Sequence, residues 1–150
     1  MTSAGLLMYR HGPGGLEVLL AHPGGPYWAR KDDGAWMLPK GELEPGEDPL
    51  AGARREFTEE IGIDPPGPYA SLGEVVQKGG KRVLAWAVAG DFAPEQLRST
   101  EFEMEWPPRS GKMRAFPEVD KVGWFSVPAA RAKMLPSQWP FVERLAAALE

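Results

Sequence analysis

The chain lacks cysteine altogether and has only two histidines among its 150 residues. Disulfides, thiolate nucleophiles and cysteine-based zinc sites are therefore excluded, and two histidines are too few for a histidine-rich metal site. Long hydrophobic runs are missing too, since no apolar stretch approaches the roughly 18 residues that indicate a membrane-spanning helix. The N-terminal stretch MTSAGLLMYRHGPGG has too short an apolar core for a secretory signal. We therefore expect a soluble cytoplasmic protein with no membrane partner.

Positive charge is also scarce, because the 17 lysines and arginines are outnumbered by 21 acidic residues, which gives a net charge of −4. A nucleic acid polymer usually needs a broad basic face, so this composition argues against such a partner. Small phosphorylated molecules remain possible ligands, because a bound metal ion can make the local electrostatic field positive. With 43% hydrophobic residues, the chain can bury one core, and we expect a single domain over residues 1–150. The oligomeric state stays open, a homodimer included.

What the chain does contain is a dense motif from Gly41 to Ile63, GELEPGEDPLAGARREFTEEIGI. Bulky apolar residues occupy set places in it, at Phe57 and Ile63. Seven glycine or charged positions are set as well: Gly41, Glu47, Arg55, Glu56, Glu59, Glu60 and Gly62. At average residue usage, a chance match to the whole pattern has a probability on the order of 10⁻⁸ or less.

A helix over residues 49–61 is predicted within this motif. Asp48 is a good N-cap, and Gly62 followed by two prolines is a stop signal. At roughly 100° per residue, one arc of the helix forms a buried face, consisting of Leu50, Ala53, Phe57 and Ile61. A neighbouring arc carries three carboxylates, those of Glu56, Glu59 and Glu60. Because these charges repel one another, and because hard cations prefer oxygen ligands, the arc predicts a site for Mg²⁺ or Mn²⁺.

A solvated helix face is the alternative explanation for the stretch RREFTEE. The loop of residues 41–46 argues against it, because its glycines let the backbone come near an ion and a free carbonyl there could complete the coordination. Arg55 lies on the far side of the helix from Glu60. We expect it to pair with Glu47 and to fasten the loop to the helix, a structural role.

The spacing GX5EX7REUXEEXGU, where U is a bulky apolar residue, resembles the Nudix box without a departure. The resemblance implies a metal-dependent hydrolase in which the Gly41 carbonyl and the box glutamates bind the metals. In the resembling family the base is a box glutamate in some members and a loop glutamate in others. Glu56 is therefore the first candidate here and Glu118 the second. The preceding LPKG is similar to the branch that cleaves dinucleoside polyphosphates or diphosphoinositol polyphosphates.

Residues outside the motif supply further candidates for substrate contacts. Lys40 is within loop reach of a bound polyphosphate, and an ordinary exposed lysine is the alternative. Arg82 is a second candidate phosphate contact, and solvated turns are the alternative for it and for the others: Arg30, Lys31, Lys78 and Lys81. Either Glu118, or Glu103 or Glu105, could bring a fourth carboxylate over the helix. Four aromatic residues could stack on a base, although aromatic residues in strands more often belong to a core: Tyr27, Trp28, Trp86 and Trp106.

The hydrophobic pattern predicts a mixed α and β fold. Strands are expected over residues 4–10, 16–21, 36–38, 69–77, 82–89 and 122–125. A C-terminal helix should begin at residue 136, whereas residues 92–118 are rich in Pro, Gly and charge and are typical of a loop that carries specificity. Strands on both sides of a central helix, with a second helix at the end, suit a three-layer α/β/α sandwich around a mixed β-sheet. The family resemblance implies the same sandwich.

These features together predict a metal-dependent pyrophosphohydrolase that cleaves a phosphoanhydride bond in a nucleoside diphosphate derivative. We expect dinucleoside polyphosphates as the first choice of substrate, nucleoside triphosphates as the second and diphosphoinositol polyphosphates as the third. A Nudix-like module that binds a nucleotide without cutting it is the rival hypothesis, but a decayed box would be expected there. Isomerisation of a prenyl diphosphate would call for a nucleophilic cysteine, which the chain lacks.

Overall fold

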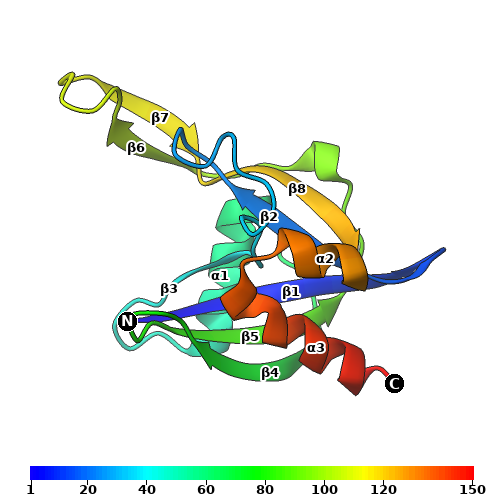
Figure 1. Ribbon diagram of the computed structural model, residues 1–150. Coiled ribbons are helices and arrows are strands. Elements are labelled where there is room, and N and C mark those ends of the chain that lie inside the picture. Colours follow the sequence, from blue (N-terminus) through cyan, green and yellow to red (C-terminus); the bar gives the residue numbers. More distant parts are fainter.

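Strands and helices are interspersed along the chain in the computed structural model, which describes residues 1–150 (Figure 1). The strands are β1 Thr2–Gly12, β2 Gly15–Pro23, β3 Lys40–Glu42, β4 Tyr69–Val76, β5 Arg82–Ala89, β6 Glu101–Glu105, β7 Met113–Pro117 and β8 Val119–Ser126. The α-helices are α1 Pro49–Ile61, α2 Val127–Lys133 and α3 Trp139–Ala148. No helix is long and apolar enough to cross a membrane.

The main sheet is mixed, as predicted, with strand order β4-β5-β1-β2-β8 and β3 paired to β1. The β1–β5 pair is parallel, and the other pairs are antiparallel. One edge of β1 pairs with β5, so β2 and β3 share the other edge. Along that edge, β3 pairs with residues 3–5 of β1, and β2 pairs with residues 9–12. The sheet therefore splits between β2 and β3, and Lys40 begins β3 at this split.

Two apolar layers lie on opposite faces of the sheet, because successive strand residues point to opposite sides. Leu7 packs with the layer that includes Phe141 and Leu145 of α3, whereas Leu6 packs with the layer that includes Phe57 and Ile61 of α1. In Figure 1, α1 lies behind the sheet and α2 and α3 lie in front of it. The predicted α/β/α sandwich is confirmed.

Helix α1 has the bounds and caps that its sequence predicts. The Asp48 side chain accepts a hydrogen bond from Ala51 N at 3.0 Å, and Gly62 ends the helix at φ 105°, a conformation that favours glycine. Phe57 and Ile61 are fully buried. This packing sets the rotation of the helix and turns the glutamate arc toward β3 and the start of β8.

Three of the predicted elements differ from the structure. Residues 36–38 do not form a strand, because Trp36 and Met37 make only isolated bridges to single partners, and the strand lies at β3 instead. Residues 92–118 contain the β6–β7 hairpin rather than only loop. Its period-two alternation of Glu with Phe or Met in EFEME is a strand signal that the surrounding Pro and Gly concealed. The C-terminal helix begins at Trp139, after a 3₁₀ turn over Pro136–Gln138.

Candidate functional site

A polar cavity of about 370 Å³ lies between β3, the glutamate arc of α1 and the base of the β6–β7 hairpin. No hydrophobic side chain lines it. Its lining residues are Lys40, Gly41, Glu42, Glu56, Glu59, Glu60, Thr100 and Glu118. Five carboxylates thus surround a space with one lysine. The structure brings the candidate metal ligands of the motif together with Glu118 in this one cavity.

Three carboxyl groups of this cavity, those of Glu56, Glu60 and Glu118, have raised pKa values, and burial is the largest cause for each. Burial, followed by repulsion from Glu56, raises the pKa of Glu60 to about 9. Burial also raises the pKa of Glu56, against the opposing hydrogen bond from Arg55. The pKa of Glu118 is raised by burial and by the charge of Glu59. Such an excess of buried negative charge is what a bound cation relieves.

The donor set of the cavity fits a hard divalent cation, because carboxylates and carbonyls supply only oxygen atoms. No three acidic or histidine side chains converge into a preformed metal cage in the structure. Arg55 Nη1 donates a hydrogen bond to Glu56 Oε1 at 2.9 Å. The fit therefore rests on donor chemistry and on the raised pKa values, with Glu56, Glu59, Glu60 and the Gly41 carbonyl as candidate ligands.

Gly41 packs directly against the carboxyl group of Glu56. A Cβ added at Gly41 would lie 1.9 Å from both Cδ and Oε2 of Glu56, much closer than atoms can approach. The requirement for glycine at this position is therefore steric. It lets β3 lie against α1 with the glutamate between them.

The variant Gly41→Ala should lower kcat by about 100-fold, because it displaces the Glu56 carboxylate and a misplacement of about 1 Å can cost that much. The melting temperature should change little, since the displaced group is the end of a flexible side chain. Steady-state kinetics and thermal melting check both expectations. Gly14→Ala is the matched control, because an added Cβ there meets no atom within 4 Å. Unchanged kinetics in Gly41→Ala would contradict the assigned contact.

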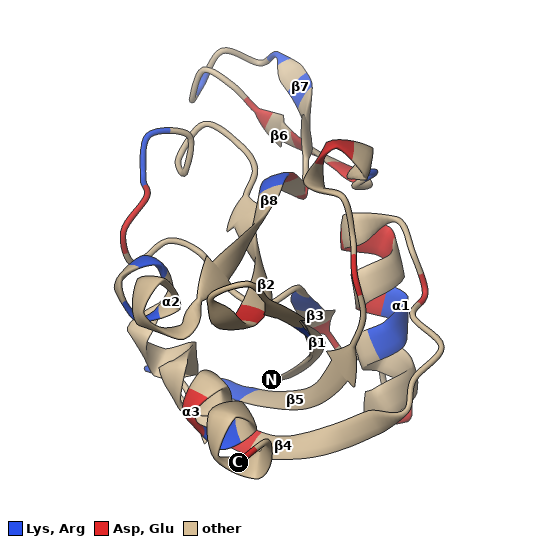
Figure 2. Ribbon diagram, turned by 90° about the vertical axis from the view of Figure 1, so that its right-hand side faces the viewer, with Lys and Arg blue, Asp and Glu red and all other residues tan.

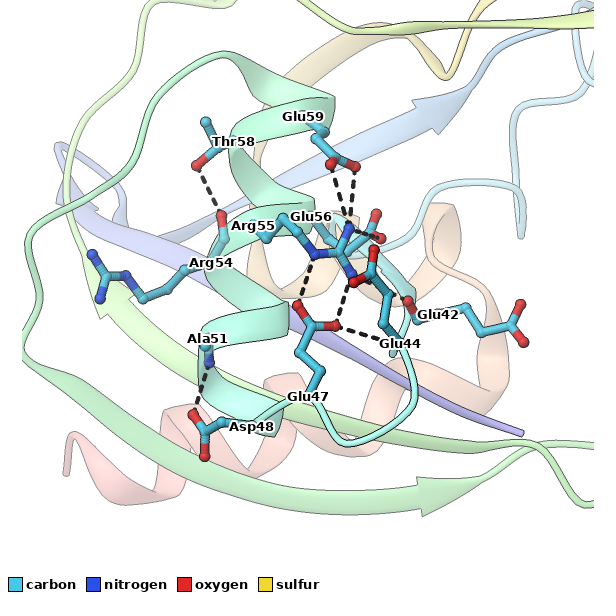
Figure 3. A network of polar contacts seen from close by, with 10 residues as sticks. All are labelled: Glu42, Glu44, Glu47, Asp48, Ala51, Arg54, Arg55, Glu56, Thr58 and Glu59. Atoms are coloured by element: carbon cyan, nitrogen blue, oxygen red, sulfur yellow. Dashed lines mark hydrogen bonds and ion pairs between the residues drawn. The ribbon is translucent and has the colours of Figure 1, made fainter.

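Arg55 joins the loop before α1 to the glutamate arc (Figure 3). Its Nε and Nη2 donate to the two carboxylate oxygens of Glu47 at 2.8 and 2.9 Å. Its Nη1 donates to Glu56 at 2.9 Å and to Glu59 at 3.3 Å. The bond from Arg55 is the main cause that lowers the pKa of Glu47 to about 2. One guanidinium therefore orients the loop and two candidate metal ligands at once.

The remaining candidates separate into those at the cavity and those elsewhere. Lys40 lines it, is half-buried and has a pKa lowered by burial. Arg82 does not line it and instead pairs with Glu74 at 2.6 Å, so the geometry does not support a substrate contact there. Glu103 and Glu105 are exposed on β6 and do not reach it either.

Two lining residues were not among the candidates from the sequence. Glu42 follows Gly41 on β3, and Thr100 precedes β6. Glu42 could have been proposed from the sequence, because it lies inside the motif. Nothing in the sequence pointed to Thr100, because its position depends on the backbone hydrogen bond from Thr100 N to Glu59 O at 2.8 Å.

Comparison with known proteins adds an independent line of evidence. The model of the NUDIX domain matches residues 1–145. An RNA pyrophosphohydrolase of Rhodospirillum rubrum is 30% identical, over 98% of this chain and 90% of that protein. An 8-oxo-(d)GTP phosphatase of Mycolicibacterium smegmatis is 33% identical over 87% of this chain but only 36% of its own length.

A solved structure agrees with the fold. The Ap4A hydrolase of C. elegans, in a binary complex, superposes with a TM-score of 0.66 at 21% identity, covering 98% of this chain and 97% of that one. The matched domain model spans nearly the whole chain, and the relatives are named as hydrolases of phosphorylated compounds. The chain therefore belongs to the Nudix family and is a Nudix hydrolase.

Proposed function

We propose that the chain is a single-domain, divalent-metal-dependent pyrophosphohydrolase that cleaves a phosphoanhydride bond in a nucleoside diphosphate derivative. The observation that carries the proposal is the cavity in which Glu56, Glu59, Glu60 and Glu118 meet around a space with no apolar lining. A phosphoanhydride is protected from hydrolysis by its own negative charge, so the site must neutralise charge and align a water molecule. The proposed cofactor is Mg²⁺ or Mn²⁺, which would supply that neutralisation and acidify the attacking water.

The side chains of the cavity have separate proposed roles. Glu56, Glu59, Glu60 and the Gly41 carbonyl would hold the cation, and Arg55 keeps the first two glutamates in place through its hydrogen bonds. Lys40 stands beside the carboxylates and offsets the charge that develops on the phosphates.

Glu56 is the first candidate for the general base and Glu118 the second. Burial raises the pKa of both carboxyl groups, which strengthens each as a proton acceptor. Glu118 makes no hydrogen bond or ion pair to Arg55, whereas Glu56 does. Comparing Glu56→Gln with Glu118→Gln separates them, because loss of the base flattens the acidic limb of the pH–rate profile.

Dinucleoside polyphosphates are the first choice of substrate, nucleoside triphosphates the second and diphosphoinositol polyphosphates the third. The similarity in fold to an Ap4A hydrolase supports the first, and the relative named as an 8-oxo-(d)GTP phosphatase supports the second. A screen of nucleotides with Mg²⁺, reading released phosphate and pyrophosphate, tests the ranking. Faster cleavage of nucleoside triphosphates than of dinucleoside tetraphosphate at equal Mg²⁺ would reverse it. No cleavage of any nucleotide with either metal would favour the non-catalytic binding module.

Lys40→Ala should impair substrates with four or more phosphates more than substrates with two. The expected difference in kcat/KM is about tenfold, the effect of one charged contact worth about 1.4 kcal/mol. Lys40→Arg, which keeps the charge, is the control. Kinetics on a dinucleoside tetraphosphate and on a two-phosphate derivative check the result. An equal loss on both would make Lys40 a general electrostatic helper that does not sense chain length.

A further inference from the structure

His22, near the end of β2, is fully buried, although the proposed reaction does not use its side chain. Its Nδ1 lies 2.8 Å from Asp120 Oδ1 on β8, and its Nε2 lies 2.6 Å from the carbonyl oxygen of Lys31, in the loop after β2. The ring packs edge-on against that of Trp36, with centroids 5.2 Å apart. One imidazole therefore joins β2, β8 and the loop after β2.

Asp120 lies at an irregularity in the pairing of β2 with β8. His22 is paired with Lys121. The next residue of β2, Pro23, is paired with Val119, so Asp120 is an extra residue without a paired residue on β2. This is the pattern of a β-bulge, which bends its strand and changes the direction of side chains. The hydrogen bond between His22 and Asp120 therefore fastens the bulge to β2.

The bulge determines which side chains of β8 face α1. Val119 and Val122 lie three positions apart, so a regular strand would point them to opposite faces of the sheet. Both are buried and pack in the layer that includes Phe57 of α1. Removal of the extra residue would turn one of the two valines away from α1 and would shift the chain before it. The bulge therefore fixes the backbone at the start of β8.

Glu118 directly precedes β8 and lines the polar cavity. Its N donates to Thr100 O at 2.8 Å, and its carbonyl accepts a hydrogen bond from Gly24 N at 3.0 Å. The next amide, Val119 N, donates to Ser99 Oγ at 3.0 Å. Figure 2 shows β8 starting at the base of the β6–β7 hairpin. The position of the Glu118 carboxylate therefore follows from the position of this backbone, two residues from the bulge.

We propose that His22 and Asp120 are positioning residues, which fasten the bulge of β8 and so hold Glu118 at the polar cavity. The loop after β2 belongs to the same arrangement, because Gly24 N bonds to Glu118 O and Lys31 O bonds back to His22. A role confined to stability is the alternative. The effect on catalysis rests on the proposed function, in which Glu118 is the second candidate for the general base.

Amide hydrogen exchange tests the positioning without metal or substrate. In Asp120→Ala the imidazole loses its partner on the bulge, so the start of β8 should open more often. The bonded amides of Gly24, Glu118 and Val119 should then exchange about tenfold faster, as expected for loss of one hydrogen bond to a charged group. The amide of Phe57 in α1 should exchange as in the wild type, because the opening is local.

The change is made at Asp120, whose side chain is 31% exposed, because truncation of the buried His22 would leave a cavity in the core. Asp120→Asn should exchange like the wild type, since its amide can donate to or accept from Nδ1. Asp33→Ala is the second control, because it removes an exposed acid that pairs with Lys133 in the same region. Wild-type exchange at the three amides in Asp120→Ala would overturn the positioning.

Turnover tests whether the positioning acts through Glu118. Asp120→Ala should lower kcat on the order of 100-fold with little change in KM, as a misplacement of about 1 Å can, and Asp120→Asn should keep most of the activity. In a Glu118→Gln background, Asp120→Ala should cause no further loss, because both changes act through one group. An equal further loss in that background, or wild-type turnover in Asp120→Ala, would overturn the link to the cavity. Hydrolysis of no nucleotide by the wild type, with the faster exchange as expected, would overturn the proposed function and leave the positioning standing.

Discussion

Glu60→Gln should reduce turnover by on the order of 10³-fold while the fold stays intact. Glu60 lines the cavity beside Glu56 and Glu118, and a charged ligand to the cation contributes several kcal/mol of charge stabilisation, each 1.36 kcal/mol being a factor of ten. The core residues Phe57 and Ile61 lie on another face of α1 and are untouched. Turnover measured across a Mg²⁺ titration checks the expectation. A wild-type rate at limiting Mg²⁺ would exclude Glu60 as a metal ligand.

The same variant should make the metal-free protein more stable at alkaline pH. The folded pKa of Glu60 is raised to about 9, above its ordinary value, so the protonated form is favoured in the folded state. Its contribution to stability is complete below about pH 4.5 and is lost as the pH rises toward 9. In EDTA at pH 8, Glu60→Gln should therefore melt at least about 3 °C above the wild type, the shift that roughly 1 kcal/mol produces in a domain of this size. At pH 4 the two should melt alike. A lower melting temperature than the wild type at pH 8 would contradict the burial of an uncompensated charge.

Arg55→Ala should lower activity by about 100-fold and also lower the melting temperature. Its guanidinium orients Glu56 and Glu59 and holds Glu47, so its loss releases the loop and misplaces two candidate ligands. Arg55→Lys should restore little, because an ammonium cannot reproduce the two parallel bonds to Glu47. The matched control is Arg54→Ala, the neighbouring arginine, which is exposed and pairs with Asp64 away from the cavity.

The difference in stability between Arg55→Ala and the wild type should depend on pH. The pKa of Glu47 is lowered to about 2, so its bond with Arg55 stabilises the fold above about pH 4.5 and is lost as the pH falls toward 2. Thermal melting across this range should show the two curves converging in acid. If melting is unaffected at neutral pH and only KM rises, Arg55 acts on the substrate instead of on the loop.

The central helix and the position of its glutamate arc were predictable because their signals are local. Asp48 and Gly62 mark the ends of α1 within a few residues of sequence, and the 3.6-residue period separates the buried face from the glutamate arc. The apolar runs of β1 and β2, and the strand patterns on both sides of the turn KGGK at β4 and β5, located much of the sheet for the same reason. The strand expected at residues 36–38 was wrong because a strand also needs a partner of matching register, and Met37 meets only Ala21.

The sequence alone therefore determined the family motif, the glutamate arc and the layered α/β class, since each follows from spacing along one segment. Only the tertiary structure decided which distant residues join that arc. Glu118 and Thr100 reach the cavity through backbone bonds across the base of a hairpin, and Arg82 is kept away by Glu74. Repulsion from Glu56, which helps to raise the pKa of Glu60, follows from their shared helix arc, whereas burial, the largest cause, comes only from the packed fold.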